Sequence, residues 1–251
     1  MLKRSSRVSP LSVAAAAAVL TVLWQGLSIL LDSIALPPPM AVFRHFTTDI
    51  AIQISTHLGI SLYRVTVSLT LGVATAAPLG MLVGRSKRID GACAPLIYLL
   101  YPIPKIVLLP VFLMILGIGD LSKILLITMI VFFQILVATR DAARAINPAL
   151  IVSMRSLGAG RWDLFRHVVV PGCLPKVFSC LRVSLGTAIA VLFLTETYAT
   201  THGIGFYIMD ALSRFDYVDV FAGVLIMSAM GFLLFSLLDL IEHRACRWQH
   251  I

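Results

Sequence analysis

Residues Asn147 to Pro175 read NPALIVSMRSLGAGRWDLFRHVVVPGCLP. The stretch holds three arginines, one aspartate and three glycines, in a chain that otherwise consists mainly of long apolar runs. Charged side chains are costly inside the hydrocarbon core, so this stretch is too polar to cross a bilayer. We therefore expect it to connect two membrane-spanning helices from outside the membrane.

The composition of the whole chain is typical of an integral membrane protein. Of its 251 residues, 59% are hydrophobic and 13% are charged, and the mean hydropathy is +0.96. A soluble core of this size cannot hide so much apolar surface. A net charge of +8 would suggest nucleic acid in a soluble domain, but here the basic residues cluster between apolar runs, where they set orientation. No nucleic-acid partner is expected.

The four cysteines give no sign of a metal site or a disulfide framework. Cys93, Cys173, Cys180 and Cys246 form no CxxC pair and have no histidine partner at metal-ligand spacing. Isolated thiols in or near membrane helices are the simpler interpretation. We expect no metal and no cofactor.

We expect an all-α fold with six spanning helices and a single transmembrane domain over residues 1–251. About 20 apolar residues cross the hydrocarbon core. The predicted spans are residues 11–31, 58–83, 94–116, 121–138, 174–195 and 220–240. The first is predicted to remain as a helix, because no small-residue cleavage site follows it. Residues 36–57 are predicted to form an outer loop with a short surface helix.

Prolines mark the third predicted span as unusual. Pro102, Pro104 and Pro110 lie inside it, and each removes a backbone donor and frees carbonyls that must find other partners. We expect a kinked helix that packs inside a bundle and is a candidate for the transport pathway.

The distribution of positive charge predicts the orientation. Fourteen lysines and arginines lie before span one, between spans two and three, from Arg140 to Lys176, and after span six, whereas three lie in the remaining connections. Because cytoplasmic loops are enriched in Lys and Arg, both termini and the 147–175 segment are expected in the cytoplasm.

The 147–175 segment itself is predicted to be a helical hairpin. Asn147-Pro148 is a good helix start, and an apolar stripe follows it, made by Leu150, Met154 and Leu157. Gly158-Ala159-Gly160 then breaks the helix and leaves the backbone bare, before a second short helix from Arg161. Two interpretations stay open on these grounds: a membrane-surface hairpin whose arginines meet anionic headgroups, or a docking site for another protein.

The spacing within the hairpin resembles the cytoplasmic signature of permease subunits of bacterial ABC importers. The family pattern is Glu-Ala-Ala, three residues, Gly, nine residues and Ile-x-Leu-Pro; here Gly158 is followed after nine residues by Val168-Val169-Val170-Pro171. Val152-Ser153-Met154 replaces Glu-Ala-Ala, so the usual acidic residue is absent. The residues that are retained are Arg155, Leu157, Gly158, Ala159, Arg161, Trp162, Phe165, Pro171, Leu174 and Pro175.

The resemblance covers nearly the whole chain and points to the nitrate/sulfonate/taurine branch of these permeases. Motifs similar to that branch are Leu36-Pro37-Pro38-Pro39, Arg64, residues 80–86, Pro102-Ile103-Pro104, residues 116–119, Ser122-Lys123-Ile124, Leu181-Arg182-Val183, Thr195-Glu196 and Gly203-Ile204-Gly205. Lys105 is a departure, since the branch often has another proline there.

The resemblance implies a type I ABC importer permease that transports a small solute such as a sulfonate, taurine or nitrate. It implies a homodimer in the bacterial inner membrane, two cytoplasmic ATPase subunits and an extracytoplasmic substrate-binding protein. The chain has no G-x-x-x-x-G-K-[ST] phosphate loop, so a partner must bind and hydrolyse ATP. The residues expected to couple to the ATPase are Arg155, Ser156, Leu157, Gly158, Ala159, Gly160, Arg161, Trp162 and Phe165.

The residues considered for the translocation path are Pro102, Pro104, Lys105, Arg182 and Glu196. A basic group within a span marks function by default, so Lys105 and Arg182 could line a path for an anion. The alternative is that each pairs with helix-end carbonyls or snorkels to the interface. Glu196 could line the outer mouth of the path or satisfy a neighbouring helix end.

Two other classes of protein were weighed. An ion-gradient-driven secondary transporter would often show inverted repeats and acidic residues at the membrane midplane, but the acids of this chain lie at the ends of spans. A membrane-embedded enzyme would need a convergent set of catalytic polar residues, and the sequence suggests none.

Overall fold

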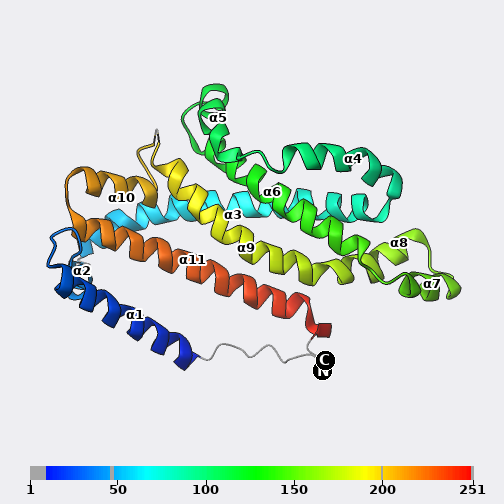
Figure 1. Ribbon diagram of the computed structural model, residues 1–251, viewed down its shortest axis with the longest axis horizontal. Coiled ribbons are helices and arrows are strands. Elements are labelled where there is room, and N and C mark those ends of the chain that lie inside the picture. Colours follow the sequence, from blue (N-terminus) through cyan, green and yellow to red (C-terminus); the bar gives the residue numbers. More distant parts are fainter. Residues whose placement is uncertain (1–9, 46–47, 199, 250–251) are drawn as a thin grey trace.

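The computed structural model describes residues 10–45, 48–198 and 200–249, and this part of the chain is helical and contains no β-strand (Figure 1). The predicted N-terminal charges Lys3, Arg4 and Arg7 lie outside the described residues. The helices are α1 (Pro10–Leu31), α2 (Pro39–His45), α3 (Thr48–Arg85), α4 (Lys87–Leu100), α5 (Leu109–Leu116), α6 (Asp120–Arg144), α7 (Pro148–Ser156), α8 (Arg161–Leu164), α9 (Val170–Glu196), α10 (Ile204–Ser213) and α11 (Tyr217–Ala245). Short helical turns lie at Lys105–Leu108, Phe165–Val169 and Arg247–Gln249.

Among the described residues, five helical segments are long and apolar enough to cross a membrane, and six if one bent pair counts as a span. The five are Leu11–Leu31, Ile54–Arg85, Asp120–Arg144, Arg161–Glu196 and Tyr217–Ala245. The bent pair is Lys87–Leu100 with Lys105–Leu116. The expectation of an all-α membrane protein is confirmed.

The third predicted span is broken, not only kinked. α4 ends at Leu100, and the axis turns by 78° before Lys105–Leu116. The prolines explain the break, because Pro102 and Pro104 supply no amide donors and restrict the residues before them. In a single copy of the chain α4 has no buried residue, so the predicted burial of this span inside the bundle is not seen within one protomer.

α3 begins earlier than predicted. The segment before residue 58 was predicted as an outer loop with a short helix, and α2 is that short helix. α3, however, starts at Thr48, and it continues without interruption because residues 48–58 contain neither proline nor glycine. α9 likewise starts at Val170, four residues before the predicted span, with Pro171 in its first turn, where the missing amide costs nothing.

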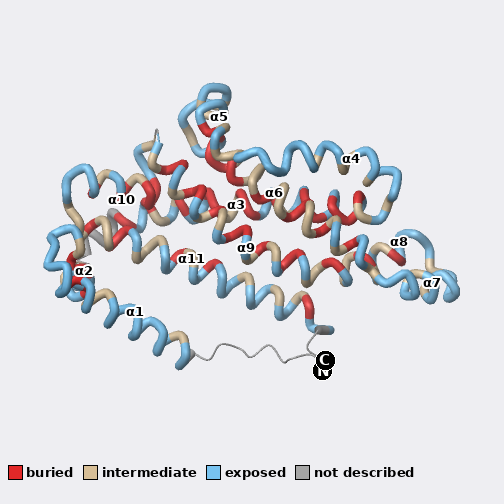
Figure 2. The backbone as a smooth tube through the Cα atoms, viewed as in Figure 1, coloured by how far each residue is buried: buried red, intermediate tan, exposed pale blue. Residues whose placement is uncertain are grey.

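The centre of the bundle is formed by α3, α6 and α9, and Figure 2 shows the buried residues concentrated along these helices. Glycines let α3 and α6 approach closely. A Cβ atom on Gly80 would lie 2.8 Å from the Leu136 carbonyl oxygen, and one on Gly84 would lie 2.3 Å from the Arg140 carbonyl oxygen. Only small residues permit such backbone contact between membrane helices.

α4 and α5 lie on one side of this centre, with α11 and α1 on the other (Figure 1). Among the five candidate spans α1 is the least enclosed, since none of its apolar window is buried. Trp24 of α1 stacks on Phe221 of α11 and donates to the Pro37 carbonyl oxygen.

Candidate functional site

The segment predicted to couple the chain to an ATPase lies between α6 and α9 and projects beyond the ends of the neighbouring long helices (Figure 1). We call residues 147–169 the elbow. Its first arm is α7, which starts as the sequence predicts: Asn147 Oδ1 accepts a hydrogen bond from the Ala149 amide at 2.9 Å, and Pro148 occupies the first turn.

Gly158 makes the bend of the elbow. Its φ of +85° lies in the left-handed region, which glycine enters without steric cost. The turn is closed by two bonds, from the Gly158 amide to the Arg155 carbonyl oxygen at 2.9 Å and from the Ala159 amide to that of Met154 at 3.1 Å. A Cβ atom at Gly158 would meet nothing within 4 Å in the protomer. The left-handed backbone therefore favours glycine here, and the outer side of the bend is open to a partner.

The second arm of the elbow starts at Gly160. The Gly160 amide donates to Asp163 Oδ2 at 2.9 Å, which fixes the start of α8. Trp162 and Phe165 stack with ring centroids 5.8 Å apart. Leu164 is buried and anchors this arm to the protein, whereas Trp162 is 69% exposed.

The exposed surface of the elbow is both apolar and cationic. Leu157 at the tip is 83% exposed, and Leu150 and Val152 on α7 are also exposed. Met154, predicted on the same stripe as Leu150 and Leu157, is partly buried. Of the other predicted coupling residues, Arg155, Ser156, Gly158, Gly160 and Arg161 are exposed and Ala159 is half-buried. The arrangement suits insertion into a matching groove of another molecule.

Glu196 lies at the opposite end of the bundle and is fully buried. Its carboxylate accepts hydrogen bonds from Ser61 Oγ at 2.8 and 2.9 Å, from Arg64 at 2.8 Å and from the Gly205 amide at 2.9 Å. The bond to Gly205 reaches the first turn of α10. A contact of this kind is what the second interpretation of Glu196, that of satisfying a neighbouring helix end, requires.

Arg64 is the centre of this buried network, and sequence reasoning noted it only as a family motif. Besides Glu196, its guanidinium contacts Asp120 at the start of α6 at 2.6 Å and donates to the His202 carbonyl oxygen at 2.9 Å. The sequence held one signal for this ion pair: Arg64 lies near the start of one predicted span, and Glu196 lies at the end of another span that runs antiparallel to it. Lys123, counted among the outer charges, is also buried, and its ammonium donates to the Gly119 carbonyl oxygen at 3.3 Å.

Lys105 lies in the break between α4 and α5. Its ammonium donates to the carbonyl oxygens of Leu100 and Tyr101, both at 3.0 Å, and of Ile103 at 3.3 Å. It also lies 4.5 Å from the ring centroid of Phe133 on α6. The lysine thus supplies donors to carbonyls that the broken helix leaves free, which is the structural alternative to an anion path.

Arg182 pairs with two carboxylates of α11. It donates to Asp239 at 2.7 Å and also bonds to Glu242. The three groups together carry a net negative charge, so they do not offer an unpaired cation to an anionic solute. They hold α9 against the last helix.

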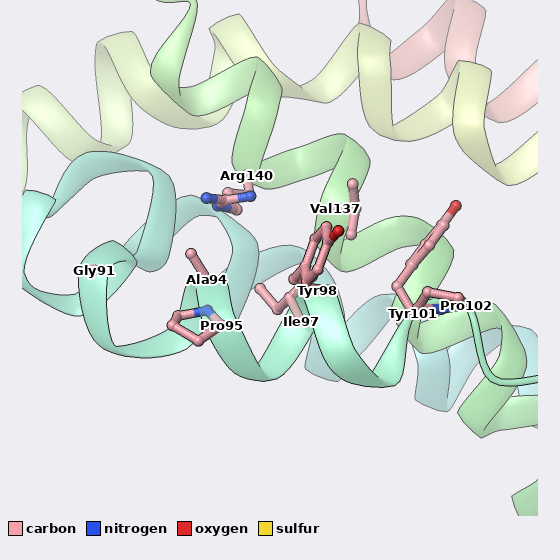
Figure 3. A pocket seen from close by; sticks show the side chains of 9 residues that line it. All are labelled: Gly91, Ala94, Pro95, Ile97, Tyr98, Tyr101, Pro102, Val137 and Arg140. Carbon is pink, nitrogen blue, oxygen red and sulfur yellow. The ribbon is translucent and has the colours of Figure 1, made fainter.

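A cavity of about 650 Å³ lies between α4 and α6 (Figure 3). It is lined by Gly91, Ala94, Pro95, Ile97, Tyr98, Tyr101, Pro102, Val137 and Arg140. Pro102 is the one predicted path residue in its wall. Arg140 bonds to Asp90, which also accepts from Arg144 at 3.1 Å, so one carboxylate offsets only one of the two positive charges.

The described part of the chain contains no group of three or more His, Cys, Asp or Glu side chains that could hold a metal ion. The four cysteines, all of which lie within that part, are free thiols.

A helical membrane bundle with an exposed elbow between its central spans defines a membrane transport subunit. The chain belongs to the family of binding-protein-dependent transport system inner membrane components, which matches residues 76–246. It is 31% identical to the taurine transport system permease protein TauC of Escherichia coli, over 97% of this chain and 91% of TauC. It is 30% identical to SsuC of Bacillus subtilis, which is named for the transport of aliphatic sulfonates, over 93% of this chain and 86% of SsuC.

The fold matches a solved structure of the MetNI methionine ABC transporter in an inward-facing conformation, with a TM-score of 0.65. The match covers 80% of this chain and 98% of that one at 17% sequence identity, so it bears on the fold alone. Together the comparisons make this chain the permease component of an ABC importer, as the elbow signature predicted.

Proposed function

We propose that two copies of this chain assemble with two cytoplasmic ATPase subunits and an extracytoplasmic substrate-binding protein. The description of the family as binding-protein-dependent supports the external partner. The sequence supports the ATPases, because the chain lacks a phosphate loop and ATP must be bound and hydrolysed elsewhere. The permease subunit itself is non-catalytic and needs no cofactor.

In this proposal the complex lies in the bacterial cytoplasmic membrane, with the elbow and both termini in the cytoplasm. The asymmetric distribution of Lys and Arg supports this orientation. The buried Arg64–Glu196 network then lies at the extracytoplasmic end, since it occupies the end of the bundle opposite to α7 and α8 (Figure 1).

The observation that carries the proposal is the geometry of Gly158, a left-handed bend with an open outer side on a projecting, exposed elbow. A short rigid elbow seated in a groove of the ATPase would transmit nucleotide-driven closure as a rigid-body tilt of the helices. That tilt would open the path alternately to the two sides of the membrane.

The transported solute is proposed to be a small anion such as taurine, another sulfonate or nitrate. The names of TauC and SsuC support the sulfonate class. The proposed path runs beside the α4–α5 break at Pro102 and Pro104. Lys105 lies in that break, and Arg182 and Glu196 stay in the proposal as further candidates, but the contacts of all three within the protomer support a role in holding the helices.

Substitution of Gly158 tests the coupling role. Asn tolerates positive φ, so Gly158→Asn keeps the bend but adds a side chain to the docking surface. Phe215→Asn is the matched control, because Phe215 also has positive φ (+59°) in a bend that closes the end of a helix, is 74% exposed, and lies after α10, far from the elbow in sequence. We expect Gly158→Asn to abolish binding of the ATPase and Phe215→Asn to leave that binding intact. Equal ATPase binding by both variants would refute the docking role.

Uptake into proteoliposomes tests the energy source and the solute. The complete complex should import taurine, alkyl sulfonates or nitrate only with ATP inside and with the binding protein outside. Uptake by the permease alone, driven by an ion gradient and stopped by an ionophore, would support the secondary transporter instead. Ligand binding to the external protein would identify the solute most directly.

A further inference from the structure

The elbow carries an unbalanced positive charge. Its charged residues are Arg155, Arg161, Arg166 and Asp163, which gives a net charge of +2. All three arginines are exposed, and within the described part of the chain none of them forms an ion pair. The single carboxylate is held by the Gly160 amide. The three guanidinium groups are therefore available to a molecule outside the protomer.

Several arginines elsewhere in the bundle form ion pairs within the chain, which sets the elbow apart from them. Arg140 and Arg144 share Asp90, Arg182 bonds to two carboxylates, and Arg64 bonds to Asp120 and Glu196. Arg155 and Arg161, in contrast, flank Gly158 at three residues on either side, on the most exposed part of the elbow.

On the basis of the proposed coupling role, we infer that the groove of the ATPase that receives the elbow has an apolar floor and an acidic rim. Leu157 and Trp162, which are 83% and 69% exposed, would fill the floor. Carboxylates on the rim would face Arg155, Arg161 and Arg166. The first arm of the elbow presents Val152 where the family has an acidic residue, so no acid of α7 repels such a rim.

An anionic membrane surface is the competing partner for the same cations. The elbow projects beyond the ends of the long helices, with its apolar tip farthest from the bundle (Figure 1). An interfacial hairpin would be expected to turn its apolar side chains back toward the hydrocarbon. The exposed Leu157 and Trp162 favour a protein groove.

Binding of the ATPase to the permease in neutral-lipid nanodiscs tests whether the rim of the ATPase groove is acidic. The triple variant Arg155→Gln/Arg161→Gln/Arg166→Gln should weaken binding by on the order of tenfold and remove most of its dependence on salt. Asp163→Asn keeps an oxygen for the Gly160 amide while raising the net charge, so it should bind at least as tightly as the native protein. The control Arg244→Gln/Arg247→Gln neutralises two exposed arginines at the C-terminal end of α11 and should leave affinity unchanged.

The outcomes separate this inference from the proposal on which it rests. If Gly158→Asn blocks binding but the triple variant binds normally at all salt concentrations, the acidic rim is refuted and the coupling role stands. If the triple variant loses affinity only in nanodiscs that contain anionic lipid, the arginines contact the membrane and the inference is also overturned. Failure of the native elbow to bind the ATPase at all would overturn both.

Discussion

Replacement of Arg64 by methionine is expected to destabilise the end of the bundle opposite to the elbow. The side chain of Arg64 is 4% exposed and that of Glu196 is fully buried. Methionine keeps much of the apolar volume but, among the residues that the structure describes, leaves the Glu196 carboxylate with Ser61 and the Gly205 amide as its donors. Removing one partner of a buried pair costs about 3–5 kcal/mol, because the remaining charge is no longer compensated.

A thiol-reactive fluorogenic dye can measure this loss during heating in nanodiscs, because Cys173 and Cys246 are buried and react only after unfolding. At about 2–4 °C per kcal/mol for a chain of this size, the midpoint should fall by roughly 6–20 °C. The exposed pair Arg214–Asp210 is the matched control, and Arg214→Met should change the stability by only about 0–1 kcal/mol.

A double-mutant cycle with Arg64→Met and Glu196→Met sharpens the test. If the two residues compensate each other, the double variant loses much less than the sum of the two single losses. A midpoint for Arg64→Met that falls no further than that of Arg214→Met, or additive losses in the cycle, would contradict the assignment of a buried ion pair.

Three further outcomes are expected. Gly84→Ala should separate α3 from α6 and destabilise the protein by about 1–3 kcal/mol, because the new Cβ atom would lie 2.3 Å from a carbonyl oxygen. Gly59→Ala on the same helix has open space around the new Cβ atom and should leave the stability unchanged. Equal melting curves for the two variants would contradict this expectation. Lys105→Met should reduce the amount of folded permease while leaving uptake per molecule unchanged, and a changed apparent affinity for the solute would instead restore the anion path. Arg182→Met should likewise lower stability and expression, since it leaves two carboxylates of α11 unpaired, with normal uptake by the surviving molecules.

The membrane class and most of the helices could be predicted because apolar length is a local property. The elbow could also be predicted, since Asn147-Pro148 and Gly158 specify a helix start and a bend through their own backbone preferences. The start of α3 at Thr48 was missed because residues 48–57 mix apolar and polar residues and so lack the continuous apolar run on which the prediction relied.

The roles of the intramembrane charges could not be read from the sequence, because they depend on which helices become neighbours. The sequence alone does not show that the break between α4 and α5 places the Lys105 ammonium on three carbonyl oxygens. Arg64 and Glu196 are 132 residues apart, and only the packing of α3 against α9 brings them together. The sequence shows which residues are charged, but it does not show which of them form ion pairs.

The separation between Arg64 and Glu196 also has a consequence for biogenesis. At a synthesis rate of about 5–20 residues per second, the arginine emerges from the ribosome roughly 7–26 seconds before Glu196 exists. Asp120 is made earlier, but its side chain is 48% exposed, so until Glu196 arrives Arg64 lacks its buried partner, and the insertion machinery or the membrane interface must shelter it. The bundle can close only after α9 arrives, so a ribosome stalled between these helices would leave an intermediate suited to recognition by membrane quality control.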